Sequence, residues 1–211
     1  MKLFLASSLD KTMPLLFERM EKPSRGIEVL FVENAAEPYD DKWWVALDRE
    51  AFSKYGCQIT DIDLKSISKD ELIQHIEHAD ILHICGGNLF YLLSLIEQRG
   101  IDQAIVQSVR DNKILYTGTS AGSIIAAQSV DLYIHDEEGL KYAEDRTDFS
   151  GLGLVNFLII PHIGNPKFSE HTKNMVGHLS KNSQPVLMLN DSQAVWVEDD
   201  KFEIVSSNSQ S

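Results

Sequence analysis

Residues 113–122 have the sequence Lys-Ile-Leu-Tyr-Thr-Gly-Thr-Ser-Ala-Gly. The apolar run Ile114–Thr117 predicts a strand, and the apolar residues Ser123–Gln128 after the second glycine predict a helix. Between them lies the pattern G-x-S-x-G, in which small neighbours let the backbone make the sharp turn of a nucleophile elbow and present the serine at its tip. A simpler alternative is a glycine-flanked turn whose serine only caps the helix. The strand before the pattern and the helix after it favour the elbow, with Ser120 as candidate nucleophile and the Ala121 amide as a donor to its oxyanion.

Apolar runs alternate with amphipathic segments on both sides of this stretch, which is typical of a parallel sheet covered by helices. The strands expected before and within it are Lys2–Ala6, Ile27–Val32, Gln58–Asp63, Ile81–Ile84 and Ile114–Thr117. The expected helices are Thr12–Met20, Asp41–Tyr55, Lys69–His78, Leu89–Arg99 and Asp102–Arg110. We therefore expect an α/β fold, a mostly parallel central sheet with helices on both faces in flavodoxin-like layering. Such sheets bind their ligands at the carboxyl ends of the strands.

The polar segment Val130–Gly153 interrupts this alternation, and we expect a long loop or short hairpin near the site, a solvated acidic excursion being the alternative. Beyond it we expect strands at Phe157–Ile160, Val186–Leu189, Ala194–Val197 and Phe202–Val205, with a helix over Ser169–Leu179. No linker or repeat interrupts the chain, so residues 1–205 are expected to form one α/β domain, and residues 206–211 a disordered tail.

The composition excludes several classes of partner. The 32 acidic residues against 19 Lys and Arg give a net charge of −13, which opposes binding to nucleic acid and to anionic membranes. Cys57 and Cys85 cannot form a disulfide framework or a closed thiolate zinc site. The N-terminal apolar run is too short for a signal peptide, and no stretch approaches the roughly 20 apolar residues of a membrane span. We expect a cytoplasmic protein with reduced thiols. The oligomeric state stays open, a homodimer included.

A second glycine turn, Gly86-Gly87, follows the strand Ile81–Ile84 and opens the helix at Leu89. A glycine pair at a strand end can direct a backbone N–H toward the site of a neighbouring strand, so Gly87 is a candidate second oxyanion donor. The alternative, a tight turn ending in Asn88 as an N-cap, is compatible with that role. The turn lacks the lysine and spacing of a phosphate-binding loop.

A serine nucleophile needs a general base. Of seven histidines, His162 directly follows an apolar strand and precedes an irregular loop, which is where α/β folds carry catalytic groups. A buried structural histidine is the alternative. No sequence motif for a metal site is present, so we expect no metal and no cofactor.

Three segments together resemble one known family. The segment Gly118–Gly122, the upstream run Gly86–Phe90 and the strand end Pro161-His162 are similar to peptidase family S51, which includes dipeptidase E and cyanophycinase. The resemblance extends from about Met1 to Phe202. It implies a fold like that of class I glutamine amidotransferases, Ser120 as nucleophile, His162 as base, and hydrolysis of short or unusual peptide bonds without a metal.

The acid that orients the histidine is less clearly marked. By resemblance it lies on a later segment, where Asp191 follows the apolar run Val186–Leu189. The family members named above have a glutamate there, one methylene longer. Glu138 and Asp136 in the polar loop are alternatives, and Glu198 is a weaker one in an acidic turn.

These residues predict a serine peptidase that acts on short peptides or small amides through an acyl-enzyme. Alternatives are a cyanophycinase-like hydrolase of branched peptides and a non-hydrolytic, amidotransferase-like binding or sensor protein. An ordinary α/β-hydrolase esterase is disfavoured by the short sequence after the elbow. Candidate cations for a substrate carboxylate are Lys141, Arg146, Lys167 and Lys173.

Overall fold

The computed structural model describes residues 1–20, 22–142 and 146–207. Its main sheet has the strand order β3-β2-β4-β5-β1-β8-β9. The first five strands in this order are parallel, and β8 and β9 are antiparallel. The strands are β1 (Lys2–Ala6), β2 (Glu28–Val32), β3 (Gln58–Asp61), β4 (Ile81–Ile84), β5 (Leu115–Thr119), β8 (Gln193–Glu198) and β9 (Lys201–Ser206). The predicted α/β fold with a mostly parallel sheet is confirmed.

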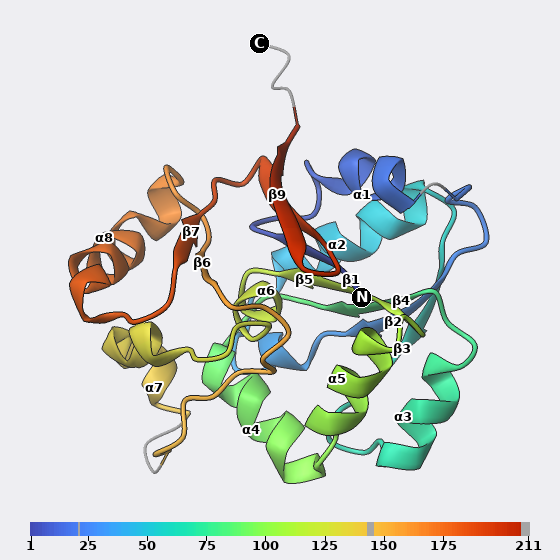
Figure 1. Ribbon diagram of the computed structural model, residues 1–211, viewed down its shortest axis with the longest axis horizontal. Helices are drawn as coiled ribbons and strands as arrows, with labels where there is room; N and C mark the ends of the chain where they lie inside the picture. Colours follow the sequence, from blue (N-terminus) through green and yellow to red (C-terminus); the bar gives the residue numbers. More distant parts are fainter. Residues whose placement is uncertain (21, 143–145, 208–211) are drawn as a thin grey trace.

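Helices cover both faces of this sheet (Figure 1). On one face lie α1 (Met13–Met20) and α2 (Trp43–Lys54), and on the other α3 (Lys69–Ile76), α4 (Leu89–Arg99) and α5 (Asp102–Arg110). Successive strand residues alternate between the two apolar cores, so that Leu3 and Leu5 join the α3–α5 side while Phe4 and Ala6 join the α1–α2 side. Burial on both faces explains why the central strands are almost continuously apolar.

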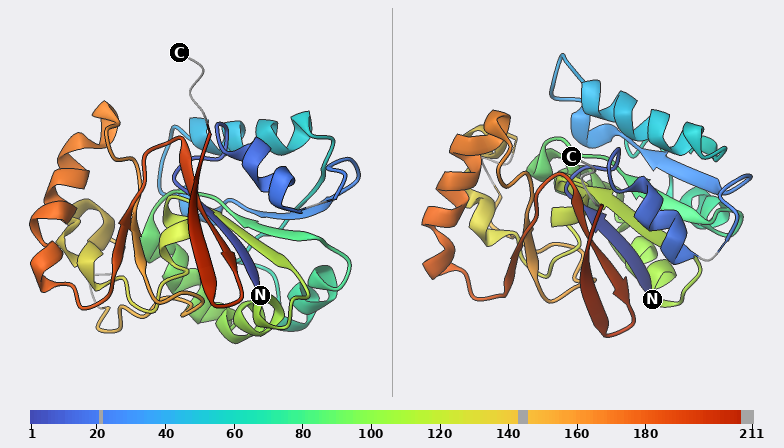
Figure 2. Two further views of the ribbon diagram at one scale, coloured as in Figure 1. Left: turned by 45° about the horizontal axis from the view of Figure 1, so that its top comes forward. Right: turned by 90° about the horizontal axis from the view of Figure 1, so that it is seen from above.

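A second, two-stranded parallel sheet lies beside the main one, with α8 next to it (Figure 2). It consists of β6 (Leu158–Ile160) and β7 (Val186–Met188), and α8 covers Ser169–Gly177. Short 3₁₀ helices η3 (Pro166–Phe168) and η4 (Leu179–Lys181) flank α8. Both strands are expected from the sequence, and the structure puts them in a sheet of their own.

The predicted helix Ser123–Gln128 is wrong in position. The helix there, α6, covers only Ala121–Ile124, and β5 before it extends to Thr119. The reason is a competing set of hydrogen bonds: the carbonyls of residues 125–127 accept N–H groups of the returning segment 152–154 at 2.7–2.9 Å. An apolar run buried against a neighbouring segment has no need to continue as a helix.

The described residues of the polar segment Val130–Gly153 do not form a two-stranded hairpin. It contains η2 (Asp131–His135) and the short α7 (Glu137–Leu140), and an isolated bridge between Ser129 and Ser150 closes its base. A further 3₁₀ helix, η1 (Asn34–Ala36), follows β2.

The predicted tail begins too early. Ser206 pairs with Gln193 in the β8–β9 ladder, and the Ser207 N–H donates to the Ser192 carbonyl at 2.9 Å. These two residues are therefore ordered by backbone hydrogen bonds, and residues 208–211 lie outside the described part of the chain. Across the described residues, no helix has the length and apolar character needed to cross a membrane.

Candidate active site

Ser120 lies on a strained turn between β5 and α6. Its backbone has φ 48° and ψ −112°, a conformation that costs a non-glycine residue about 1–3 kcal/mol. The turn needs glycine at both flanking positions. A Cβ added to Gly118 would lie 2.4 Å from the carbonyl oxygen of Gly122, and a Cβ added to Gly122 would lie 2.0 Å from the carbonyl oxygen of Ile84. The serine occupies the N-cap position of α6, yet its side chain makes no capping hydrogen bond. The geometry is that of an elbow that presents the hydroxyl, and the capping alternative does not describe it.

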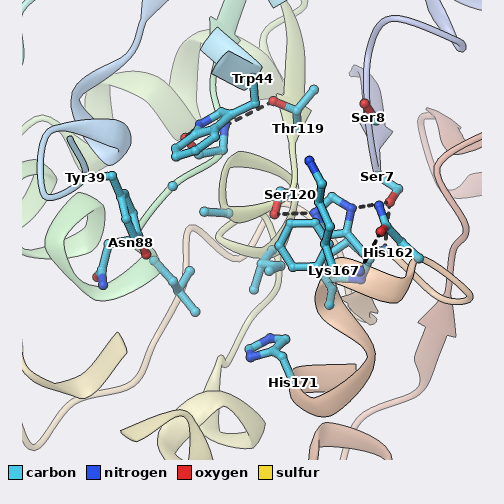
Figure 3. Close-up of a pocket in the computed structure, with 18 of the residues that line it drawn as sticks. Ser7, Ser8, Tyr39, Trp44, Asn88, Thr119, Ser120, His162, Lys167 and His171 are labelled. Carbon is cyan, nitrogen blue, oxygen red and sulfur yellow. Dashed lines mark hydrogen bonds between the residues drawn. The ribbon is translucent and has the colours of Figure 1, made fainter. Parts of the chain in front are cut away.

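His162 reaches this hydroxyl from the second sheet. It follows β6 through Pro161 and has a positive φ of 63°. Its Nε2 lies 3.0 Å from Ser120 Oγ, and its Nδ1 lies 2.6 Å from Asp191 Oδ1. The ring of Phe168 stacks on one face of the imidazole, with 4.1 Å between centroids. The structure thus brings Ser120, His162 and Asp191 into one hydrogen-bonded chain. Figure 3 shows the side chains of Ser120 and His162 directed toward each other.

Asp191 follows β7, at the same edge of the small sheet from which His162 emerges. Partial burial disfavours its charged form, but hydrogen bonds from His162, Asn165 and Ser7 outweigh that cost and lower the pKa of Asp191 to about 2. Asn165 Nδ2 donates to Oδ2 at 2.6 Å. The carboxylate is therefore charged throughout the neutral range and accepts hydrogen bonds on both oxygens.

Ser7 is a site residue that the sequence analysis missed. It directly follows β1, the neighbour of β5 in the main sheet, and is 1% exposed. Its Oγ donates to Asp191 Oδ1 at 2.8 Å and accepts the His162 backbone N–H at 2.8 Å. One side chain of the main sheet therefore contacts both members of the His–Asp pair. Its position at a strand's carboxyl end is the signal that could have found it.

The two candidate oxyanion donors line the same cavity as Ser120. Ala121 is the first residue of α6, so its N–H lies among the helix amides without an intrahelical acceptor. Gly87 follows β4, and no hydrogen bond recorded for the described residues uses its N–H. The neighbouring Gly86 is close to the elbow, since a Cβ built on it would lie 3.0 Å from Ser120 Cβ.

Among the described side chains, neither Asp136, which lines the same cavity as Ser120, nor Glu198 is hydrogen-bonded to His162. Asp136 Oδ2 lies 3.8 Å from Nδ1 of another histidine, His171. Glu198 pairs with Lys2 at 3.0 Å at the far end of β8. The side chain of Glu138 lies outside the part of the chain that the structure describes.

A cavity of about 530 Å³ opens over Ser120. Its wall includes residues of the β2–α2 connection, of η2 and α7, and of the loop after His162. Of the four candidate cations, Lys167 lines it, and its ammonium lies 4.4 Å from the centroid of the Trp43 ring. Arg146 instead pairs with Glu97. Burial lowers the pKa of His171, as does the charge of His162, while Asp136 opposes the shift.

Three buried side chains with metal-binding groups also come together behind the elbow. The ligand atoms of Asp48, His83 and Cys85 lie within 4.8 Å of one another. Sequence spacing gives no hint of this cluster, because its members come from α2, β4 and the turn after β4. The expectation of a metal-free protein stays a prediction.

The fold and this site define a class: an α/β protein with a mostly parallel sheet, a serine on a strand–helix elbow and a histidine–carboxylate pair beside it. The model of peptidase family S51 matches residues 3–205. The chain belongs to this family; it is an enzyme of the serine peptidase class and resembles peptidase E. Membership of a peptidase family argues against the alternative of a non-hydrolytic, amidotransferase-like binding or sensor protein.

Individual relatives of this chain are also described as peptidases. An uncharacterized peptidase of Listeria innocua, Lin0382, is 30% identical over 94% of this chain and 93% of its own length. Peptidase E of Streptomyces coelicolor is 30% identical over 83% of this chain and 70% of its own length. The crystal structure of a candidate peptidase E protein from Listeria monocytogenes EGD-e superposes with a TM-score of 0.87 at 26% identity, covering 97% of this chain and 98% of that one.

Proposed function

We propose that this enzyme hydrolyses short peptides through a Ser120–His162–Asp191 triad and an acyl-enzyme. The single observation that carries the proposal is the continuous chain from Ser120 Oγ through His162 to Asp191, at 3.0 and 2.6 Å. Hydrogen-bond contact between nucleophile, base and orienting acid is the arrangement that activates a serine.

The charge on Asp191 sets the state of the histidine. A carboxylate facing Nδ1 favours the tautomer with the proton on that nitrogen, which leaves Nε2 with a lone pair toward Ser120 Oγ. Nε2 then accepts the hydroxyl proton as the serine oxygen attacks the peptide carbonyl. The imidazolium that forms is stabilised by Asp191.

The amides of Gly87 and Ala121 receive the negative charge that develops on the carbonyl oxygen. The tetrahedral adduct collapses, the amine leaves with the proton from Nε2, and the acyl group stays on Ser120. Water then attacks the acyl-enzyme with His162 again as base, and the second product leaves as a carboxylic acid.

The cavity favours a small substrate. Its volume of about 530 Å³ lies within the range of about 300–1,000 Å³ that suits small-molecule ligands. The polar segment 130–153 supplies part of the wall, through Tyr133, Asp136 and Gly139. A short peptide or small amide with a free end fits this enclosure better than an extended chain.

Ser120→Ala tests the mechanism. We expect an intact fold and a loss of turnover of several orders of magnitude, because triad members act as a unit. A fluorophosphonate probe should label the wild-type enzyme and Ser8→Ala, in which another cavity-lining serine is changed, but not Ser120→Ala. Retention of a tenth of the wild-type rate by Ser120→Ala would exclude the serine mechanism.

A further inference from the structure

A buried polar network lies directly behind the elbow and takes no part in the triad. Asp48 of α2 and Thr119 of β5 are each 4% exposed, and His83 of β4 is fully buried. Thr119 is the residue before Ser120. Its Oγ1 donates to Asp48 Oδ2 at 2.7 Å and accepts the Gly86 N–H at 3.1 Å.

The direction of these two bonds is fixed. A threonine hydroxyl has one proton, and the carboxylate of Asp48 can only accept, so that proton points to Asp48. The lone pairs of Oγ1 are then left facing the Gly86 amide. Asp48 therefore sets the orientation in which Thr119 can hold the glycine turn.

Helix α2 also provides a hydrogen-bond donor to the carbonyl group of Gly86. Trp44 Nε1 donates to the Gly86 carbonyl at 2.9 Å. Trp44 and Asp48 are four residues apart, on one face of α2. Both polar groups of the Gly86 residue are thus bonded to side chains that α2 carries or orients.

His83 stabilises the buried carboxylate. Its Nε2 lies 3.3 Å from Asp48 Oδ2, and its Nδ1 lies 2.9 Å from Thr117 Oγ1. The aromatic rings of Phe31 and Phe52 pack against the imidazole. Each ring nitrogen of His83 therefore has a protein partner.

We propose that Thr119, Asp48 and Trp44 are positioning residues for the oxyanion donor Gly87. This inference rests on the proposed function, in which the Gly87 amide binds the oxyanion. Two successive glycines have no side chains of their own to fix the turn, and an oxyanion donor must be held within about 0.5 Å of its productive position. The network supplies that constraint from α2 and from the nucleophile's own strand.

Thr119→Val is the decisive variant, because it keeps the shape of the side chain and removes the hydroxyl. We expect kcat to fall about 10- to 100-fold with little change in KM, since loss of a complete oxyanion donor costs about 10²–10³ in kcat. Thr119→Ser, which restores the hydroxyl, should recover most of the rate. Thr12→Val is the matched control, because Thr12 is fully buried and its hydroxyl bonds to the Ser8 carbonyl instead.

Rates are to be measured on folded protein, quantified by titration with the fluorophosphonate probe. A Thr119→Val enzyme with kcat within twofold of wild type, or with a loss equal to that of Thr12→Val, would overturn the inference and leave the serine mechanism standing. If Thr119→Val does not fold, Trp44→Phe is the second variant, because it removes only the Nε1 donor to the Gly86 carbonyl. This variant should lower kcat without raising KM. An unchanged kcat would overturn the inference. Stoichiometric zinc in the purified enzyme, lost in Asp48→Asn, would show that the cluster is a metal site and would overturn the positioning role of Asp48.

Discussion

The imidazole of His162 is held by contacts in several directions. Its two nitrogens face Ser120 and Asp191, one ring face lies on Phe168, and its backbone N–H is bonded to Ser7. A ring with so few rotational alternatives loses little freedom when substrate arrives. Preorganisation of this kind lowers the activation free energy without strengthening substrate binding.

Asp191→Asn is predicted to reduce kcat by about 10⁴-fold, the magnitude known for the corresponding change in a serine protease triad. An amide at this position can stabilise the tautomer with the proton on Nε2, where no base is then available. Steady-state kinetics with a dipeptide substrate measures the loss. Asp40→Asn, an equivalent change at an exposed carboxylate of the cavity wall, is the control and should keep most of the rate. A larger loss in Glu138→Gln than in Asp191→Asn would move the orienting acid to Glu138.

The same variant should alter the acid sensitivity of folding. Because the pKa of Asp191 is lowered from 3.8 to about 2 in the folded protein, its charged form stabilises the fold above about pH 4, and this contribution disappears as the pH falls toward 2. As the pH falls from about 4 toward 2, the Tm of the wild type should therefore decrease more than the Tm of Asp191→Asn. A difference independent of pH from 5 to about 2 would show that Asp191 does not have a lowered pKa.

The triad and oxyanion residues that sequence reasoning proposed all follow a strand within a few residues, where a local pattern can be recognised. Ser7 also follows a strand but belongs to no recognisable motif, and Asn165 lies in an irregular loop. Ser7 is 184 residues from Asp191 along the chain, and Asn165 is 26 residues away. The hydrogen bond of Ser7 depends on how the two sheets are placed side by side, and that of Asn165 depends on the pairing of β6 with β7. No single segment of sequence encodes either arrangement.

At the level of elements, the site joins two separate sheets. The proposed nucleophile follows β5 of the main sheet, whereas the proposed base and acid follow β6 and β7 of the small one. The strand pattern was recognisable because apolar residues and turns alternate. The division into two sheets was not, because three-residue strands carry no signal for their pairing partner. The length of α6 escaped prediction for a related reason: apolar periodicity cannot distinguish a helix from a buried irregular segment.

Gly87→Ala is predicted to disable the enzyme through the turn after β4. Gly87 has φ +149°, and a Cβ there would lie 2.1 Å from the Ala35 carbonyl oxygen in η1, so the backbone must move. We expect a loss of stability of about 1–3 kcal/mol and strongly reduced labelling by the fluorophosphonate probe.

Gly100→Ala is the matched control for this change. Gly100 ends α4 with φ +61° and has open space around its Cα, so only the conformational cost of about 1–2 kcal/mol should appear. Labelling of folded Gly100→Ala should equal that of wild type. Normal labelling of Gly87→Ala would mean that the turn does not contribute to the oxyanion site.

At the scale of the whole molecule, the cavity predicts a limit on substrate length. We expect kcat/KM to fall about tenfold or more from dipeptides to decapeptides of matched N-terminal sequence, since each 1.4 kcal/mol of lost interaction is a factor of ten. A panel of such peptides, assayed with the wild-type enzyme, measures this. Comparable kcat/KM across the series, or efficient cleavage of denatured casein, would show that the site is open.

The two sheets share one apolar core, in which Leu3, Leu5 and Tyr116 of the main sheet cluster with Leu158 and Ile160 of β6. We therefore propose that residues 1–205 form one domain, to which Ser206 and Ser207 also belong through their pairing with β8 and the segment before it. The homodimer stays a prediction.

The hydrogen bond between Ser7 and His162 joins residues that are synthesised far apart in time. The proposed triad, with the serine that supports it, draws on residues 7, 120, 162 and 191. A ribosome elongating this chain has released the nucleophile long before the acid emerges from the exit tunnel. The nascent polypeptide therefore lacks the complete proposed triad until residue 191 has emerged, and β6 and β7 must then dock beside the main sheet before that triad can form.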